Sequence, residues 1–206
     1  MIRILITYFI FTFLTFSSFG QKKWNFLIAD NLQFRDEINS QYKDSVHSPL
    51  TEEAREKFTA LPFFSIDTNY YIRAKFVKIE KGRIFKMKTS TSRKPTYRVY
   101  GKAIFTLRDT IHELLVYQNI ELSQKEGFED FLFLPFNDFT NGNETYGGGR
   151  YLDLKIPTSE ELILDFNKAY NPYCAYTEGY SCPIPPKENS LQTYIKAGVK
   201  YLELDH

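Results

Sequence analysis

The sequence predicts a mainly β protein, built as an antiparallel sandwich or barrel-like sheet with one or two N-terminal helices. The aromatic content favours a sheet, because 19 Phe and 15 Tyr among 206 residues suit pleated, half-buried strands. Residues 96–107 also favour it, since every second residue from Tyr97 to Leu107 is apolar or small. Strands do not alternate with long helices along the chain, which disfavours a parallel α/β sheet.

The first 20 residues have the layout of a secretory signal peptide. Arg3 gives a charged start, residues 4–16 are almost wholly apolar, and small residues lead to a predicted cleavage site near Gly20. A membrane anchor needs about 20 apolar residues, whereas this run ends at Ser17. We therefore expect a periplasmic or secreted protein without a stable membrane anchor.

The charge balance argues against a nucleic-acid partner. Lys and Arg together number 26, and Asp and Glu number 25, whereas phosphate binding needs a strong basic excess. The length suits a single domain once the signal is removed. We expect a signal peptide over residues 1–20, a helical segment over residues 21–60 and the β domain over residues 61–206.

Two helices are predicted before the sheet. The first is amphipathic, because apolar residues recur at helical spacing among charged ones, namely Trp24, Leu27, Ile28, Leu32, Phe34 and Ile38. The second begins after Thr51, which can cap a helix N-terminus, and Glu52 and Glu53 place negative charge at its positive end.

Turn signals divide the rest of the chain into strands. Lys81-Gly82 and Arg108-Asp109 help to separate four segments that should pair consecutively as antiparallel strands, at residues 70–79, 83–89, 96–107 and 111–120. Four further segments have strand character, at residues 128–136, 150–156, 162–166 and 192–202.

Acids, amides, tyrosines and glycines are concentrated in short aromatic segments between Leu134 and Asn189. The succession D-x-T, E-T-Y, G-R-Y, D-F-N, N-P-x-C and C-P-x-P-P-x-E-N occurs at residues 138–140, 144–146, 149–151, 165–167, 171–174 and 182–189. Together with Ser48-Pro49-Leu50, Phe58 and Ala197-Gly198, this string resembles the family called domain of unknown function 1684. The chain departs from the pattern at Val199, where an acid is expected in many members. The resemblance spans nearly all of the mature chain and implies no established activity.

Three carboxylates in this stretch stand beside aromatic or small residues, namely Asp138, Glu144 and Asp165. A carboxylate shielded from water needs a cation or several hydrogen-bond donors, or it becomes protonated. Arg150 is the obvious cation, and its planar fork can hold a carboxylate of the protein or of a ligand.

Three functions are compatible with these residues. In the first, Arg150 clamps a small polar or anionic ligand. The orienting groups around it would be Tyr146, Tyr151, Thr140, Thr145 and Asn167. In the second, the protein is an acid–base hydrolase or lyase that uses Asp138 or Glu144, with Asp165 as a further candidate, and two carboxylates must then face one cavity. In the third, the protein is a structural or partner-binding module in which Asp138 and Asp165 cap turns and Arg150 pairs with Glu144. The sequence leaves open whether the protein is an enzyme.

Cys174 and Cys182 are the only cysteines, and in an exported chain such a pair predicts a disulfide. A metal site or a pair of free or redox-active thiols are the alternatives. A metal would need about two more ligands, and the histidines His47, His112 and His206 are distant in sequence. Dinucleotide, P-loop and zinc-hydrolase motifs are missing from the sequence, so we expect no cofactor and no metal.

Overall fold

The structure is a computed structural model that describes residues 24–202. The predicted signal peptide and its cleavage site near Gly20 lie outside the described residues. No helix within residues 24–202 is long and apolar enough to cross a membrane.

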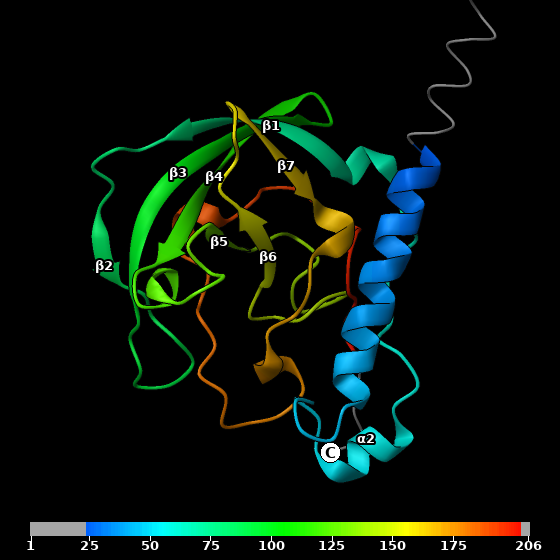
Figure 1. The fold of residues 1–206 in the computed structure, drawn as a ribbon. Helices are drawn as coiled ribbons and strands as arrows, with labels where there is room; N and C mark the ends of the chain where they lie inside the picture. Colours follow the sequence, from blue (N-terminus) through cyan, green and yellow to red (C-terminus); the bar gives the residue numbers. More distant parts are fainter. Residues whose placement is uncertain (1–23, 203–206) are drawn as a thin grey trace, which may run out of the picture.

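Within these residues, seven strands form one antiparallel sheet that curls into a half-barrel (Figure 1). The strands are β1 (Tyr71–Lys78), β2 (Ile84–Lys86), β3 (Thr96–Leu107), β4 (Thr110–Asn119), β5 (Phe131–Phe136), β6 (Arg150–Lys155) and β7 (Glu161–Asp165). Their order in the sheet is β6-β5-β4-β3-β1-β7, and β2 pairs with β3 beside this path. The predicted mainly antiparallel β fold with an N-terminal helix is confirmed, in its barrel-like form.

The segment after β7 connects the two ends of this sheet. β7 pairs with β1 at one edge, and the chain then makes a short 3-10 turn, η3, at Phe166–Lys168. Tyr170 next reaches Tyr151 of β6, and the backbone N–H of each donates to the carbonyl of the other, at 3.1 and 2.9 Å. This two-bond seam lies between the last and the first strand in the sheet order, so the half-barrel is closed locally by Tyr151 and Tyr170.

β3 is buried at every second position, as its sequence pattern predicts. A β-bulge interrupts its pairing with β4 between Val99 and Gly101, and such a bulge changes the face to which the following side chains point. Before the bulge, Tyr97 and Val99 pack in a cluster with Tyr117. After it, residues from Ala103 onward pack in the main core. One sequence pattern therefore contributes to two apolar clusters on opposite faces of the sheet.

The main core lies between the strands and the C-terminal segment of the chain. Its buried side chains come from β1 and from β3 to β7, and from the stretch that follows η3, and they include Phe76, Phe105, Leu134, Leu164, Phe166 and Ile195. Burial of one such side chain contributes roughly 1.5–3 kcal/mol, so this core is the main source of stability.

The first helix covers residues 24–43 and packs beside the half-barrel, where Figure 1 shows it in blue. Its buried side chains are Leu27, Asn31, Ile38 and Tyr42, which lie at helical spacing. The predicted amphipathic helix is therefore present, but Leu32 is 49% exposed. The polar Asn31 takes a buried place because its amide donates a hydrogen bond to a residue of the sheet.

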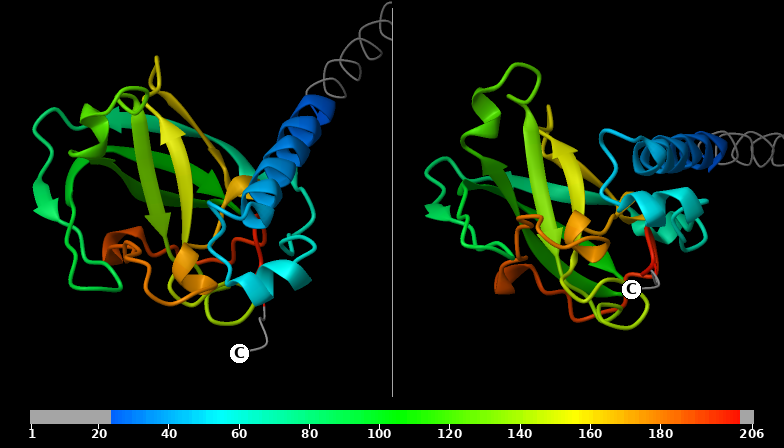
Figure 2. Two further views of the ribbon diagram at one scale, coloured as in Figure 1. Left: turned by 60° about the horizontal axis from the view of Figure 1, so that its bottom comes forward. Right: turned by 90° about the horizontal axis from the view of Figure 1, so that it is seen from below.

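The second helix, α2 (Glu52–Lys57), is capped as predicted. The Thr51 hydroxyl accepts a hydrogen bond from the N–H of Ala54 at 3.2 Å, and acidic residues occupy the first turn. Figure 2 shows α2 at the same end of the half-barrel as the orange segment around residue 175. A hydrogen bond from the Thr177 hydroxyl to the Pro49 carbonyl joins these two regions.

The prediction of a strand at residues 192–202 is wrong. This segment contains no strand. Its one β-bridge pairs Val199 with Phe63, which also lies outside the strands. The carbonyl groups of Ile195 and Ala197 accept hydrogen bonds from the side chain of Arg150, not from a neighbouring strand. Alternate residues are apolar because they enter the main core, so the pattern resembles that of a strand although the backbone has no strand partner.

Candidate functional site

Arg150 lies at the start of β6 with a fully buried side chain. Its guanidinium donates hydrogen bonds to Asp138 Oδ2 at 2.8 Å, to the Ile195 carbonyl at 2.7 Å and to the Ala197 carbonyl. The hydroxyl of Thr140 lies 3.4 Å from the same nitrogen that contacts Asp138. We call these five residues the Arg150 network. Both terminal nitrogens of the guanidinium are thus engaged by oxygens of the protein.

Asp138 is the buried counter-ion of this network, and its side chain is as inaccessible as that of Arg150. Its second oxygen accepts hydrogen bonds from the N–H groups of Thr140 and Ile195, at 2.8 and 3.1 Å. Burial lowers the pKa of Arg150 from its ordinary value, and the Asp138 carboxylate acts in the opposite direction. The pair therefore caps a turn and joins β6 to the C-terminal segment.

Glu144 does not take part in the Arg150 network. Its carboxylate lies 2.9 Å from the ammonium group of Lys196, and both side chains are partly exposed. The Arg150–Glu144 pair of the structural alternative is therefore not formed, because Asp138 takes the place of Glu144.

Replacement of this exposed pair should have a small effect. We expect Glu144→Gln to change the free energy of unfolding by less than about 1 kcal/mol, because solvent-exposed ion pairs contribute little. Urea denaturation of the variant and the wild type measures the difference. A loss above about 2 kcal/mol would contradict a peripheral role for this carboxylate.

The predicted orienting groups of this stretch lie in different places. The hydroxyls of Thr140 and Thr145 are 2.8 Å apart and fully buried, and Thr140 alone among the orienting groups has a described hydrogen bond with Arg150. The ring of Tyr146 instead covers Gly148, where an added Cβ would stand 2.4 Å from it.

Asp165 and Asn167 belong to a separate cluster at the end of β7. Asp165 accepts hydrogen bonds from the side-chain amide of Asn31 at 2.8 Å and from the side-chain amide of Asn167 at 2.9 Å. It also accepts from the backbone N–H of Asn167 at 3.1 Å, which caps η3. Asp165 therefore fastens the first helix to the sheet.

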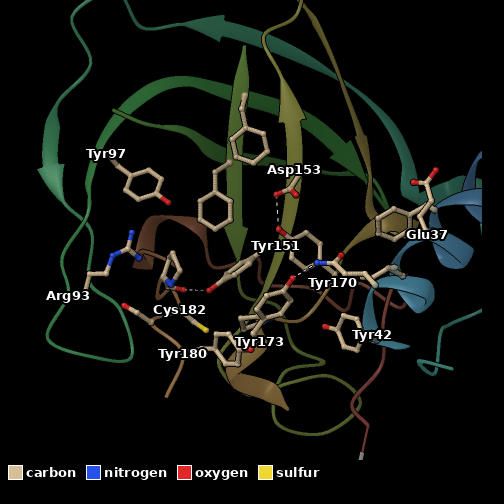
Figure 3. A pocket seen from close by; sticks show the side chains of 18 residues that line it. Glu37, Tyr42, Arg93, Tyr97, Tyr151, Asp153, Tyr170, Tyr173, Tyr180 and Cys182 are labelled. Atoms are coloured by element: carbon tan, nitrogen blue, oxygen red, sulfur yellow. Dashed lines mark hydrogen bonds between the residues drawn. The ribbon is translucent and has the colours of Figure 1, made fainter. Parts of the chain in front are cut away.

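A cavity of about 530 Å³ lies between the first helix, β5, β6 and the segment of residues 170–183 (Figure 3). Half of its 18 lining residues are aromatic: Phe34, Tyr42, Tyr97, Phe131, Phe133, Tyr151, Tyr170, Tyr173 and Tyr180. Other polar residues in the lining are Glu37, Gln41, Arg93, Asp153 and Ser181. We call this space the aromatic cavity. Its volume and composition are those of small-molecule sites in proteins.

Tyr151 lines the aromatic cavity although it follows Arg150 in the sequence. Successive side chains of a strand point to opposite faces of the sheet, so Arg150 and Leu152 point inward while Tyr151 and Asp153 point to the cavity. The Tyr151 hydroxyl donates to the carbonyl of Pro183, which holds the opposite wall of the cavity in place. Of the predicted orienting groups, Tyr151 is the one that lines this cavity.

Asp153 is a functional candidate that sequence reasoning missed. Its carboxylate is open to the cavity and accepts a hydrogen bond of 2.7 Å from the Tyr170 hydroxyl. Burial between the cavity walls raises the pKa of Asp153, and the hydrogen bond from Tyr170 acts in the opposite direction. Asp138, Glu144 and Asp165, by contrast, are not among the lining residues.

A usable signal for the cavity was present in β5. Leu132 and Leu134 enter the main core, while Phe131 and Phe133 line the aromatic cavity. A strand that is apolar at consecutive positions has both faces covered. The outward-facing pair of phenylalanines therefore indicates a second apolar region outside the main core.

Cys174 and Cys182 form a disulfide, as predicted, so neither is free as a thiol. Cys182 also lines the aromatic cavity, and the disulfide braces the loop that carries Tyr180 and Ser181. Within residues 24–202, no cluster of three or more His, Cys, Asp or Glu side chains is arranged to hold a metal ion.

A family profile described as "Protein of unknown function (DUF1684)" matches residues 56–200. The chain belongs to this family. The fold is similar to the solution NMR structure of an uncharacterised protein from Haloarcula marismortui, with 32% sequence identity and a TM-score of 0.68. That similarity covers 91% of this chain and 98% of the other. A comparison with curated proteins gave no match.

Several of the motifs that resemble the DUF1684 family belong either to the Arg150 network or to the wall of the aromatic cavity, whereas residues 165–167 form the separate cluster at the end of β7. Residues 138–140, 149–151 and 197–198 include members of the Arg150 network. Residues 171–174 and 182–189 include Pro172, Tyr173, Cys182 and Pro183 of the cavity wall. Residues 149–151 contribute to both groups, since Arg150 faces the network and Tyr151 faces the cavity.

Proposed function

We propose that the protein binds a small organic molecule in the aromatic cavity. The main support for this proposal is the composition of the cavity wall. Half of the lining residues are aromatic, and a few polar groups lie at separate points around a volume of about 530 Å³. Aromatic walls bury the apolar faces of a ligand, and isolated polar groups orient it. A purely structural cluster would fill such a space with side chains.

The aromatic cavity is a better supported site than the surroundings of Arg150, where a small polar or anionic ligand was expected from the sequence. A ligand at Arg150 would have to displace Asp138 and two backbone carbonyls from a buried guanidinium. An acid–base hydrolase or lyase that uses Asp138 or Glu144 has less support, because neither carboxylate lines the cavity.

The proposed place of action is the periplasm or the outside of the cell. The Cys174–Cys182 disulfide supports this proposal, because disulfides persist in oxidising compartments. The expected signal peptide provides the route of export.

A fragment screen tests the binding proposal. Ligand-observed NMR with a library of neutral, anionic and cationic ring compounds should give hits, and these hits should raise the melting temperature, because a molecule that binds the folded state stabilises it. Tyr180→Ala should weaken the hits by roughly tenfold, through the loss of one stacking wall.

Tyr194→Ala is the matched control for this variant. Tyr180 and Tyr194 each form one edge-to-face aromatic pair, with Tyr173 and Phe139 respectively, but Tyr194 lies outside the cavity lining. A screen without hits would rule out the aromatic cavity as the binding site. So would hits whose affinity falls equally in both variants.

A further inference from the structure

Three aromatic residues are neighbours of Asp153 on the cavity side of the sheet. Phe133 is its register partner on β5, so their Cβ atoms are cross-strand neighbours. Tyr151 stands two residues earlier on the same face of β6, and Tyr170 donates the hydrogen bond to the carboxylate. The rings of Phe133 and Tyr151 pack edge to face with their centroids 4.8 Å apart, and the rings of Tyr151 and Tyr170 do so with their centroids 5.8 Å apart. Asp153 thus stands in an aromatic box.

The carboxylate in this box has no counter-ion from the described chain. Ten ion pairs occur within residues 24–202, and none of them includes Asp153. One carboxylate oxygen accepts from Tyr170, and the side chain stays open to the cavity. The Asp153 side chain is exposed, so a cation can reach its carboxylate from the cavity. Partial desolvation by the cavity walls raises the pKa of this group.

The other charged residues of the lining do not change this conclusion. Arg93 stands beside Tyr97, on the opposite side of the cavity from the Asp153–Tyr170 pair (Figure 3). Glu37, on the first helix, adds a second negative charge at the edge of the cavity. The lining therefore carries two carboxylates and one guanidinium, and the carboxylate among the aromatic rings is that of Asp153.

We propose that the ligand of the aromatic cavity is an organic amine whose positively charged nitrogen binds Asp153 within the aromatic box. This inference rests on the proposed function and specifies the ligand class. The faces of aromatic rings attract cations, and a charge-assisted hydrogen bond to the free side of the carboxylate adds to this attraction. A neutral ligand can donate a hydrogen bond to the carboxylate but gains no cation–π attraction and no ion pair, and an anionic ligand is repelled by Asp153.

Two probes of nearly equal shape isolate the charge. 2-Phenylethylamine is a cation at pH 7.5, and 2-phenylethanol is its neutral counterpart. We expect the amine to bind the full folded chain roughly tenfold more tightly than the alcohol, as measured by ¹H–¹⁵N NMR titration. The largest shifts should fall on the amides of lining residues, such as Phe133, Tyr151, Asp153, Tyr170 and Tyr180.

Asp153→Asn removes the charge and keeps the shape. This variant should fold, because Asp153 forms no described ion pair and an asparagine oxygen can still accept from Tyr170. It should bind both probes equally weakly. Glu126→Gln, an exposed carboxylate outside the cavity lining, should retain the preference of the wild type for the amine.

The possible outcomes separate the two proposals. Equal binding of amine and alcohol by the wild type, or a preference that survives Asp153→Asn, would overturn the amine assignment. So would a preference that is lost in Glu37→Gln but kept in Asp153→Asn. If neutral or anionic fragments bind in the cavity and amines do not, the amine assignment fails while the binding function stands. If no fragment binds in the cavity, the binding function fails as well.

Discussion

Arg150→Ala should lower the free energy of unfolding by about 3–5 kcal/mol, because it leaves the buried Asp138 carboxylate without its counter-ion. The change also removes the donors to the carbonyls of Ile195 and Ala197, so the C-terminal segment should lose its attachment to β6. Arg150→Lys should also be destabilised, since one ammonium group cannot reproduce the fork of the guanidinium. Urea denaturation at pH 7 measures all of these variants.

Lys168→Ala is the control for this experiment. Lys168 pairs with Asp30 at 2.7 Å, but both side chains are partly exposed, so its loss should cost at most about 1 kcal/mol. If Arg150→Ala is no less stable than this control but loses a ligand, Arg150 is the clamp that the sequence suggested. An unfolded or strongly destabilised Arg150→Ala protein instead supports a sealed network.

Removal of the disulfide should have the second-largest effect. The chain-entropy treatment gives roughly 2.6 kcal/mol for a loop as short as that between Cys174 and Cys182, so the Cys174→Ser, Cys182→Ser double variant should lose about 2–3 kcal/mol. The loop carries Tyr180 and Ser181 of the cavity wall, and ligand affinity should fall with stability.

Reduction provides an independent check of the same bond. Wild-type protein treated with a strong thiol-free reductant should reach the stability of the double variant, and the double variant should not respond to the reductant. A change below about 0.5 kcal/mol on reduction would mean that the loop is held by its other contacts, such as the hydrogen bond from Tyr151 to Pro183.

Sequence patterns predicted most of the strands because local rules operate there. The expected pairing of residues 70–79 with residues 83–89 is wrong, because β1 pairs with β3 and β7 while β2 pairs with β3. The alternation in residues 96–107 gave both ends of β3, and the start of β6 at Arg150 was also predicted. Residues 192–202 were mispredicted because their apolar alternation reflects burial in the core, whereas their hydrogen bonds come from one distant side chain. A pattern along the chain reports burial and does not report the source of the backbone partners.

The candidate site was harder to predict for a related reason. The concentration of motifs around Arg150 was real, and Asp138, Thr140 and Arg150 do converge. The same convergence buries the guanidinium and engages both of its terminal nitrogens with oxygens of the protein. The aromatic cavity draws on the first helix, three strands and a disulfide loop, so Asp153 has no neighbour in the sequence that reveals its surroundings.

The two backbone hydrogen bonds between Tyr151 and Tyr170 are a short stretch of pairing compared with the long antiparallel pairing of β3 and β4. Both seam residues also belong to the aromatic box, because Tyr170 holds Asp153 through its hydroxyl. Local opening of the half-barrel should therefore begin at the edge of the proposed binding site. A bound ligand would stabilise this closure. It should slow hydrogen exchange at the amides of Tyr151 and Tyr170 far more than at the amides of the central strands.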